Sequence, residues 1–93
     1  MAVSKEMTVL NKVGLHARPA AMFVKKAAPF KSKISIANLS KETQPVNAKS
    51  LLSVLSIGVQ KDDRILVTCE GEDETQALDT LAELVTTNFG EEL

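Results

Sequence analysis

Residues 64–70 read Arg64-Ile65-Leu66-Val67-Thr68-Cys69-Glu70 and carry the clearest strand pattern in the chain. Ile65, Val67 and Cys69 fall on one side of an extended segment, because side chains alternate between the two faces of a strand. Leu66 and Thr68 fall on the other side. The alternation predicts a strand with one buried face, and it places the thiol of Cys69, the only cysteine, inside the protein as a structural group.

The residues that follow this strand predict a helix. Asp73 stands at an N-cap position, with Gln76 where a capping box needs it, and Gly90 is a suitable helix stop. Five apolar residues repeat at helical spacing between them: Ala77, Leu78, Leu81, Leu84 and Val85. The stripe predicts that one face of this helix covers the sheet.

Upstream residues extend the alternation of strands and helices. We expect strands at 5–11 and 33–39, an amphipathic helix from Pro19 to Ala28, and a short helix from Ser50 to about Leu55. We expect a further short strand that contains Pro45 and ends at Val46. Because Pro45 cannot donate to a ladder, this strand should lie at a sheet edge. The order β-α-β-β-α-β-α predicts one domain over 1–93. Its architecture is a two-layer, open-faced α/β (α+β) sandwich: a four-stranded antiparallel sheet with three helices on one face.

Composition narrows the possible functions. Of 93 residues, 44% are hydrophobic, which disfavours disorder, and the three Phe without Tyr or Trp disfavour a base-stacking nucleic-acid module. One cysteine and one histidine leave no disulfide or multi-cysteine metal site, so we expect no metal and no cofactor. Neither a signal peptide nor a membrane span is recognisable, and a cytoplasmic monomer is expected.

The charges are divided between the two halves of the chain. Residues 1–50 hold nine Lys or Arg against two acids, and residues 51–93 hold two against ten. Such a division is typical of proteins that bind nucleic acid or an acidic partner. We expect the basic half to surround the functional site and the acidic half to lie away from it.

His16 is the residue best suited to chemistry. It precedes a predicted helix, where free backbone N–H groups and the helix dipole favour an anion. Arg18 adds a charged fork that fits phosphate oxygens, and imidazole is a nucleophile near neutral pH. This combination suits a phosphoryl group. The alternative interpretation is that His16 is an ordinary polar residue on a surface loop with no chemical role.

Two further stretches support a family resemblance. The histidine segment, Gly14-Leu15-His16-Ala17-Arg18-Pro19-Ala20, resembles the active-site signature of the HPr family, the histidine-containing phosphocarriers of the bacterial PEP-dependent sugar phosphotransferase system. The second signature of that family resembles residues 46–52, Val-Asn-Ala-Lys-Ser-Leu-Leu, and continues to Val59. A third match is residues 70–74. The three motifs occur in collinear order over essentially the whole chain.

The resemblance implies a specific role. Family members accept a phosphoryl group on histidine Nδ1 from phospho-enzyme I and pass it to EIIA domains of sugar permeases. His16 would be the carrier and Arg18 its charge partner. The protein would be a covalent intermediate with no turnover of its own, rather than an enzyme.

Ser50 has a second implied role besides capping its helix. In many Gram-positive relatives the matching serine is phosphorylated by HPr kinase/phosphorylase, and the product assists the catabolite repression regulator CcpA. A phosphate at a helix N-terminus is electrostatically favourable.

The short helix after Ser50 carries more apolar residues than six positions can bury against one sheet, so Leu51 and Leu52 should be exposed. The resemblance implies a partner-docking surface there, made of Ala21, Lys25, Leu51, Leu52 and Leu55.

Alternatives remain at this point. They are a regulatory adapter acting only through Ser50, a nitrogen-branch relative, a small hydrolase of the acylphosphatase type, and a nucleic-acid module. His16 with Arg18 disfavours the first, and the absence of a glycine-rich phosphate loop disfavours the third. The chain departs from Gram-positive members at Ser53, Leu52 and Leu55 and in a longer 38–44 hairpin, and these changes bear on partner affinity.

Overall fold

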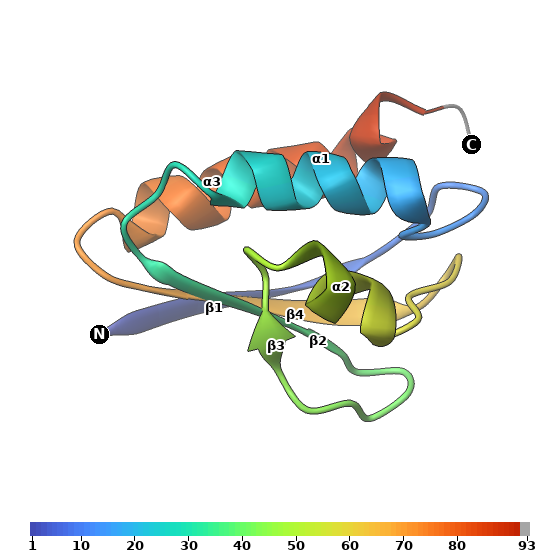
Figure 1. Ribbon diagram of the computed structural model, residues 1–93, viewed down its shortest axis with the longest axis horizontal. Helices are drawn as coiled ribbons and strands as arrows, with labels where there is room; N and C mark the ends of the chain where they lie inside the picture. Colours follow the sequence, from blue (N-terminus) through green and yellow to red (C-terminus); the bar gives the residue numbers. More distant parts are fainter. Residues whose placement is uncertain (92–93) are drawn as a thin grey trace.

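The computed structural model describes residues 1–91. Figure 1 shows its elements in chain order. They are β1 (Ala2–Thr8), α1 (Ala17–Ala27), β2 (Lys33–Asn38), β3 (Val46–Asn47), α2 (Leu51–Ser56), β4 (Arg64–Glu70), α3 (Glu74–Thr86) and a closing 3₁₀ turn (Asn88–Gly90). The predicted order is therefore confirmed, with the 3₁₀ turn as the one addition among the described residues.

The four strands form one antiparallel sheet in the order β1-β4-β2-β3. β4 lies in the interior, with Cys69 opposite Val3 of β1 and Ile34 of β2. Its central position explains why the 64–70 segment has the strongest strand pattern. β3 lies at the edge, as predicted from Pro45. The strand begins at Val46 rather than ending there, so Pro45 precedes it and takes no part in the ladder.

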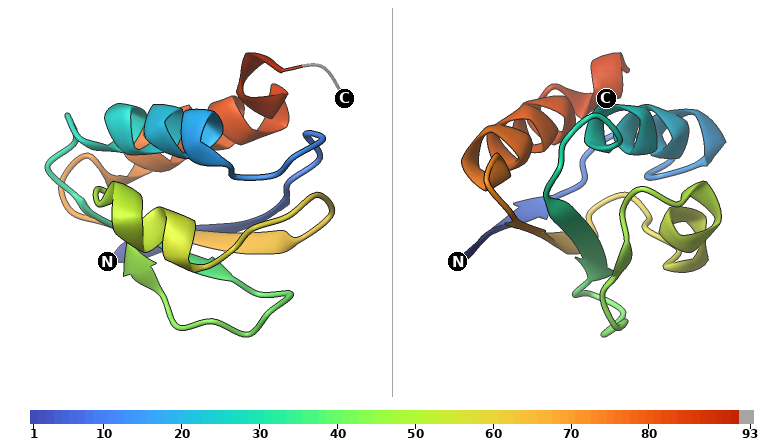
Figure 2. Two further views of the ribbon diagram at one scale, coloured as in Figure 1. Left: turned by 45° about the vertical axis from the view of Figure 1, so that its right-hand side comes forward. Right: turned by 60° about the vertical axis from the view of Figure 1, so that its left-hand side comes forward.

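The helices lie together on one side of the sheet, and the other side is open (Figures 1 and 2). α1 and α3 lie side by side above the strands, and α2 lies beside α1 next to the edge strand β3. α1 and α3 turn their apolar faces inward. Phe23 of α1 and Leu81 of α3 are fully buried, as are Ile36 and Val67 from the sheet. The two-layer architecture follows from this single core.

The bounds of the first strand and the start of the first helix differ from the sequence prediction. The first strand spans Ala2–Thr8 rather than 5–11, because Ala2 already pairs with Glu70 of β4. α1 begins at Ala17, two residues before the predicted start at Pro19, and His16 is its N-cap. The proline is tolerated in the first turn, where its missing N–H would have no partner in the helix.

The start of α3 corrects a second expectation. Asp73 is at the N-cap position, but its side chain makes no bond to its own helix, and no capping box forms with Gln76. Its carboxylate instead accepts hydrogen bonds from the Ser32 hydroxyl and from the backbone N–H groups of Lys31 and Ser32. These bonds hold the pKa of Asp73 below its usual range. Asp73 thus connects α3 to the loop that leads into β2.

Candidate functional site

His16 lies at the N-terminal end of α1 with an extended backbone, φ −74° and ψ −175°. Its side chain does not cap the helix, and its carbonyl accepts the first helical bond from Ala20 at 3.0 Å. The first N–H groups of a helix have no partner inside it, so those of Ala17 and Arg18 are placed to bind an anion. The imidazole is 35% exposed, which leaves it open to a reactant.

The loop before His16 is fixed by two neighbouring residues. Gly14 has φ +68°, and a Cβ there would lie 2.4 Å from the carbonyl oxygen of Val59. The next N–H, that of Leu15, donates to the same carbonyl at 3.0 Å, and the Leu15 side chain is buried. Because glycine alone allows this close approach, the loop holds the histidine at a defined place at the start of α1.

Glu91 completes the site from the far end of the chain. One carboxylate oxygen, Oε2, lies 3.1 Å from His16 Nε2 and accepts a hydrogen bond from an Arg18 guanidinium N–H at 2.6 Å. The other, Oε1, accepts from Asn11 Nδ2 at 3.0 Å. The Glu91 side chain is only 11% exposed. His16 and Arg18 therefore converge, as predicted, but on a carboxylate that sequence reasoning did not identify.

The charge of Glu91 is stabilised by these neighbours. Partial burial works to raise its pKa, but hydrogen bonds from Asn11, Arg18 and His16 outweigh this effect, and the pKa stays below its usual range. Glu91 belongs to the acidic half of the chain, which we expected to lie away from the site. That expectation was wrong for this residue, because the 3₁₀ turn after α3 directs the chain back toward α1.

Ser50 caps α2 as predicted, with its hydroxyl accepting the Ser53 N–H at 3.3 Å. The exposed face beside it includes Leu52, 82% exposed, and Leu51, 39% exposed, which confirms the predicted exposure of both. Ala21 and Lys25 on α1 are exposed, and Leu55 is half-buried. The residues proposed for docking therefore occupy two helices that lie side by side, α1 and α2.

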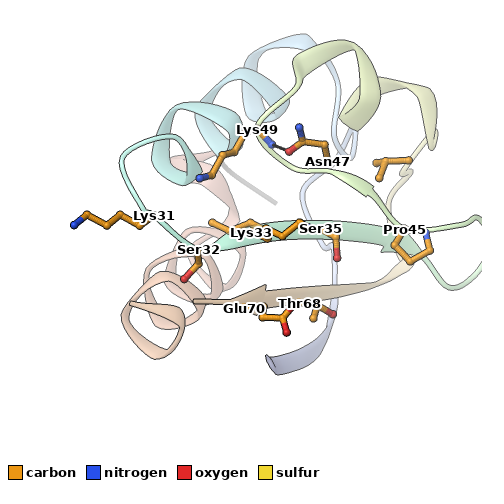
Figure 3. Close-up of a pocket in the computed structure, with 11 residues that line it drawn as sticks. Lys31, Ser32, Lys33, Ser35, Pro45, Asn47, Lys49, Thr68 and Glu70 are labelled. Atoms are coloured by element: carbon orange, nitrogen blue, oxygen red, sulfur yellow. Dashed lines mark hydrogen bonds between the residues drawn. The ribbon is translucent and has the colours of Figure 1, made fainter. Parts of the chain in front are cut away.

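Other groups that could act as functional sites lie elsewhere. Cys69 is buried, and burial raises the pKa of its thiol to about 11, which disfavours the nucleophilic thiolate. Lys49 donates to the Phe30 carbonyl beyond the C-terminal end of α1, whereas His16 stands at the N-terminal end of that helix. An open hollow of about 580 Å³ lies along β2, with β3 and β4 on its two sides. Figure 3 shows its lining residues, which include Lys33, Asn47 and Thr68. His16 is not among its lining residues.

Within residues 1–91, no group of three or more His, Cys, Asp or Glu side chains is arranged to hold a metal ion. Over the same residues, the helices are too short or too polar to cross a membrane. The site at His16 therefore consists of a histidine, an arginine, a carboxylate and the start of a helix.

Comparison with known proteins places this chain in a family. The model for the PTS HPr component phosphorylation site matches residues 3–87. Phosphocarrier protein HPr of Treponema pallidum is 40% identical over 97% of this chain and 99% of its own length. The multiphosphoryl transfer protein of Haemophilus influenzae is also 40% identical, but the chain spans only 18% of that protein.

A solved structure agrees with the sequence matches. HPr-C-His from Thermoanaerobacter tengcongensis superimposes with a TM-score of 0.91 at 41% identity, covering 98% of this chain and 99% of the other. The match extends over the open-faced sheet, the three helices and the segment that carries His16. The chain belongs to the HPr family of phosphocarrier proteins.

Proposed function

We propose that this protein carries a phosphoryl group on His16 within the sugar phosphotransferase system. The supporting observation is the placement of His16 as the N-cap of α1, with the guanidinium of Arg18 directed into the same site. The lone pair of Nδ1 attacks the phosphorus of phospho-enzyme I, and the bond between phosphorus and the donor breaks. The new phosphohistidine then gives the group to an EIIA domain of a sugar permease.

The start of α1 and Arg18 supply the electrostatics for this transfer. The free N–H groups of the first helical turn favour an anion, and Arg18, whose side chain is 71% exposed, can turn toward the phosphoryl oxygens. Both interactions strengthen as negative charge arrives. The protein itself has no turnover: it acts as a cytoplasmic carrier that each partner loads or unloads.

Partner recognition is assigned to the docking surface formed by Ala21, Lys25, Leu51, Leu52 and Leu55. Leu52 is an apolar side chain with most of its area in water, and Lys25 adds a charge for acidic partners. A carrier must bind and leave several partners quickly, which a small apolar patch with a basic rim allows. Enzyme I and EIIA domains would use the same surface in turn.

The carrier role is tested by incubating the protein with phosphoenolpyruvate and enzyme I and measuring its intact mass. We expect one added phosphoryl group that is labile in acid and stable in alkali, as a phosphohistidine is. His16→Ala should take up none, whereas Ser50→Ala, the matched control, should be phosphorylated as the wild type is. An adduct that persists in His16→Ala would refute the proposal.

Regulation through Ser50 is the second part of the proposal. The hydroxyl already lies at the start of α2, beside the exposed Leu51 and Leu52, so a phosphate there would add negative charge to the docking surface. HPr kinase/phosphorylase would be the modifying enzyme, and the phosphoserine form would assist CcpA in catabolite repression.

This regulatory role requires an acid-stable adduct when the protein is incubated with ATP and HPr kinase/phosphorylase. The adduct should be absent from Ser50→Ala and present in His16→Ala. Phosphorylation of Ser50→Ala to the same extent would place the modification at another residue and contradict the assignment.

A further inference from the structure

Glu91 is bound more fully than a surface carboxylate usually is. Both of its oxygens accept hydrogen bonds, and its three partners come from two places in the chain: Asn11 after β1, and His16 and Arg18 at the start of α1. Asn11 is fully buried and also donates to the Gly14 carbonyl at 2.7 Å. The carboxylate is therefore fixed to the same loop that positions the histidine.

The chain between α3 and Glu91 is anchored in an uncommon conformation. Asn88, Phe89 and Gly90 all have positive φ, and Phe89, at φ +55°, is a residue type for which this region is unfavourable. The Phe89 side chain is 2% exposed, so burial of the ring compensates for the backbone strain. This turn places Glu91 beside His16 instead of letting the chain leave along the axis of α3.

We propose that Glu91 is a positioning residue for phosphoryl transfer, one that keeps the proton on His16 Nε2 and stabilises the positive charge that the ring gains. A carboxylate facing Nε2 favours the tautomer with hydrogen there, which leaves the Nδ1 lone pair free. When that lone pair forms the bond to phosphorus, the donor's bond breaks and no proton leaves the imidazole. The ring then becomes cationic, as in a carboxylate–histidine pair of a hydrolase.

The division of contacts at Glu91 supports this role. Oε1 is held from the buried side by Asn11, and Oε2 is shared by His16 and the exposed Arg18. When Arg18 turns toward the arriving phosphoryl oxygens, Asn11 still keeps the carboxylate at Nε2. One arginine can thus serve the phosphoryl group while the counter-charge of the ring stays in place.

This inference rests on the proposed carrier function, so its test measures both. Rates of phosphorylation by enzyme I are compared for the wild type, Glu91→Ala, Glu91→Gln and Glu83→Ala. Glu83 is an exposed carboxylate near the end of α3, and its replacement is a control for the loss of one negative charge. Thermal unfolding of each variant separates slow transfer from partial unfolding.

We expect Glu91→Ala to slow transfer about 10- to 100-fold, the effect of losing one charge-assisted hydrogen bond. Glutamine keeps an acceptor but lacks the charge. Phosphoryl transfer to Glu91→Gln should therefore be slower than transfer to the wild type, even if it is faster than transfer to Glu91→Ala. Glu83→Ala should match the wild type. The ¹⁵N NMR signals of the His16 ring should show hydrogen on Nε2 in the wild type and a shift of the Nε2 resonance in Glu91→Ala.

Three results would overturn the inference: wild-type rates in Glu91→Ala, full recovery in Glu91→Gln, or an equal loss in Glu83→Ala. If the wild type is phosphorylated and any of these occurs, only the role of Glu91 is refuted. If the wild type takes no phosphoryl group at His16, the carrier function fails and the inference fails with it.

Discussion

Replacing Asn11 by aspartate is expected to lower the free energy of unfolding by about 3–5 kcal/mol at pH 7, the effect of leaving an unpaired charge in the interior. Asn11 is fully buried, and its Nδ2 donates to the Gly14 carbonyl at 2.7 Å and to Glu91 Oε1 at 3.0 Å. An aspartate of the same shape has no N–H to donate. It would direct a negative charge at a carbonyl oxygen and at a second carboxylate.

The loss should depend on pH in a defined direction. Burial and the charge of Glu91 raise the pKa of the new carboxyl in the folded state above its value in the unfolded chain. The variant should therefore approach the wild type below about pH 4, where the carboxyl is protonated in both states, and the difference should grow as the pH rises. Urea unfolding of both proteins across this range gives the comparison.

Asn47→Asp is the matched control for this substitution. Asn47 is exposed, and its Oδ1 accepts the Lys49 N–H at 2.9 Å, so an aspartate keeps that bond. The control should change stability by less than about 0.5 kcal/mol, as is usual for surface substitutions. Equal losses in the two variants at pH 7 would mean that Asn11 does not have the structural role assigned to it.

The local pattern of apolar residues was sufficient to predict the architecture. The buried face of β4, with Val67 fully buried, follows from alternation, as do the buried Ile34 and Ile36 of β2, and the buried stripe of α3 follows from helical spacing. The first and last residues of the strands and helices were less predictable, because they depend on partners elsewhere in the chain. β1 extends to Ala2 only because Glu70 of β4 is there to pair with it.

The same distinction separates the predicted part of the site from the part that was missed. His16 and Arg18 lie two residues apart, so their convergence follows from the start of one helix. Glu91 reaches them through a contact that spans 75 positions of sequence, and no local pattern announces it. Asn11 did leave a signal: it continues the inward alternation of Met7 and Val9, which makes it a polar residue at a buried position.

Asp73 shows how a tertiary contact can override a local rule. Its spacing from Gln76 favours a capping box, but the loop before β2 offers the backbone N–H groups of Lys31 and Ser32 and the Ser32 hydroxyl, and the carboxylate binds these instead. Sequence spacing identifies the groups available inside one element. It cannot show that a loop 41 positions away supplies better donors.

Gly14→Ala should destabilise the fold by about 2–5 kcal/mol and, at the same time, reduce phosphorylation of His16. The residue has φ +68°, where any Cβ is unfavourable by about 1–2 kcal/mol. The new methyl group would also lie 2.4 Å from Val59 O, 2.7 Å from Gln60 Cα and 2.9 Å from Gln60 C. These are backbone atoms that cannot rotate away, and overpacking of this kind is unfavourable by about 1–3 kcal/mol more.

Gly90→Ala separates the two contributions to this loss. Gly90 has nearly the same backbone, φ +73°, but no atom lies within 4 Å of the place where its Cβ would be. It should therefore lose no more than about 1–2 kcal/mol, the conformational part alone. The excess loss in Gly14→Ala, measured by urea unfolding, reports the close approach of the Gly14 loop to Val59. That approach sets the Leu15–Val59 hydrogen bond and the position of His16. If Gly14→Ala is as stable as Gly90→Ala and is phosphorylated like the wild type, the loop can move without loss of stability or of phosphorylation, and the assigned role of Gly14 is wrong.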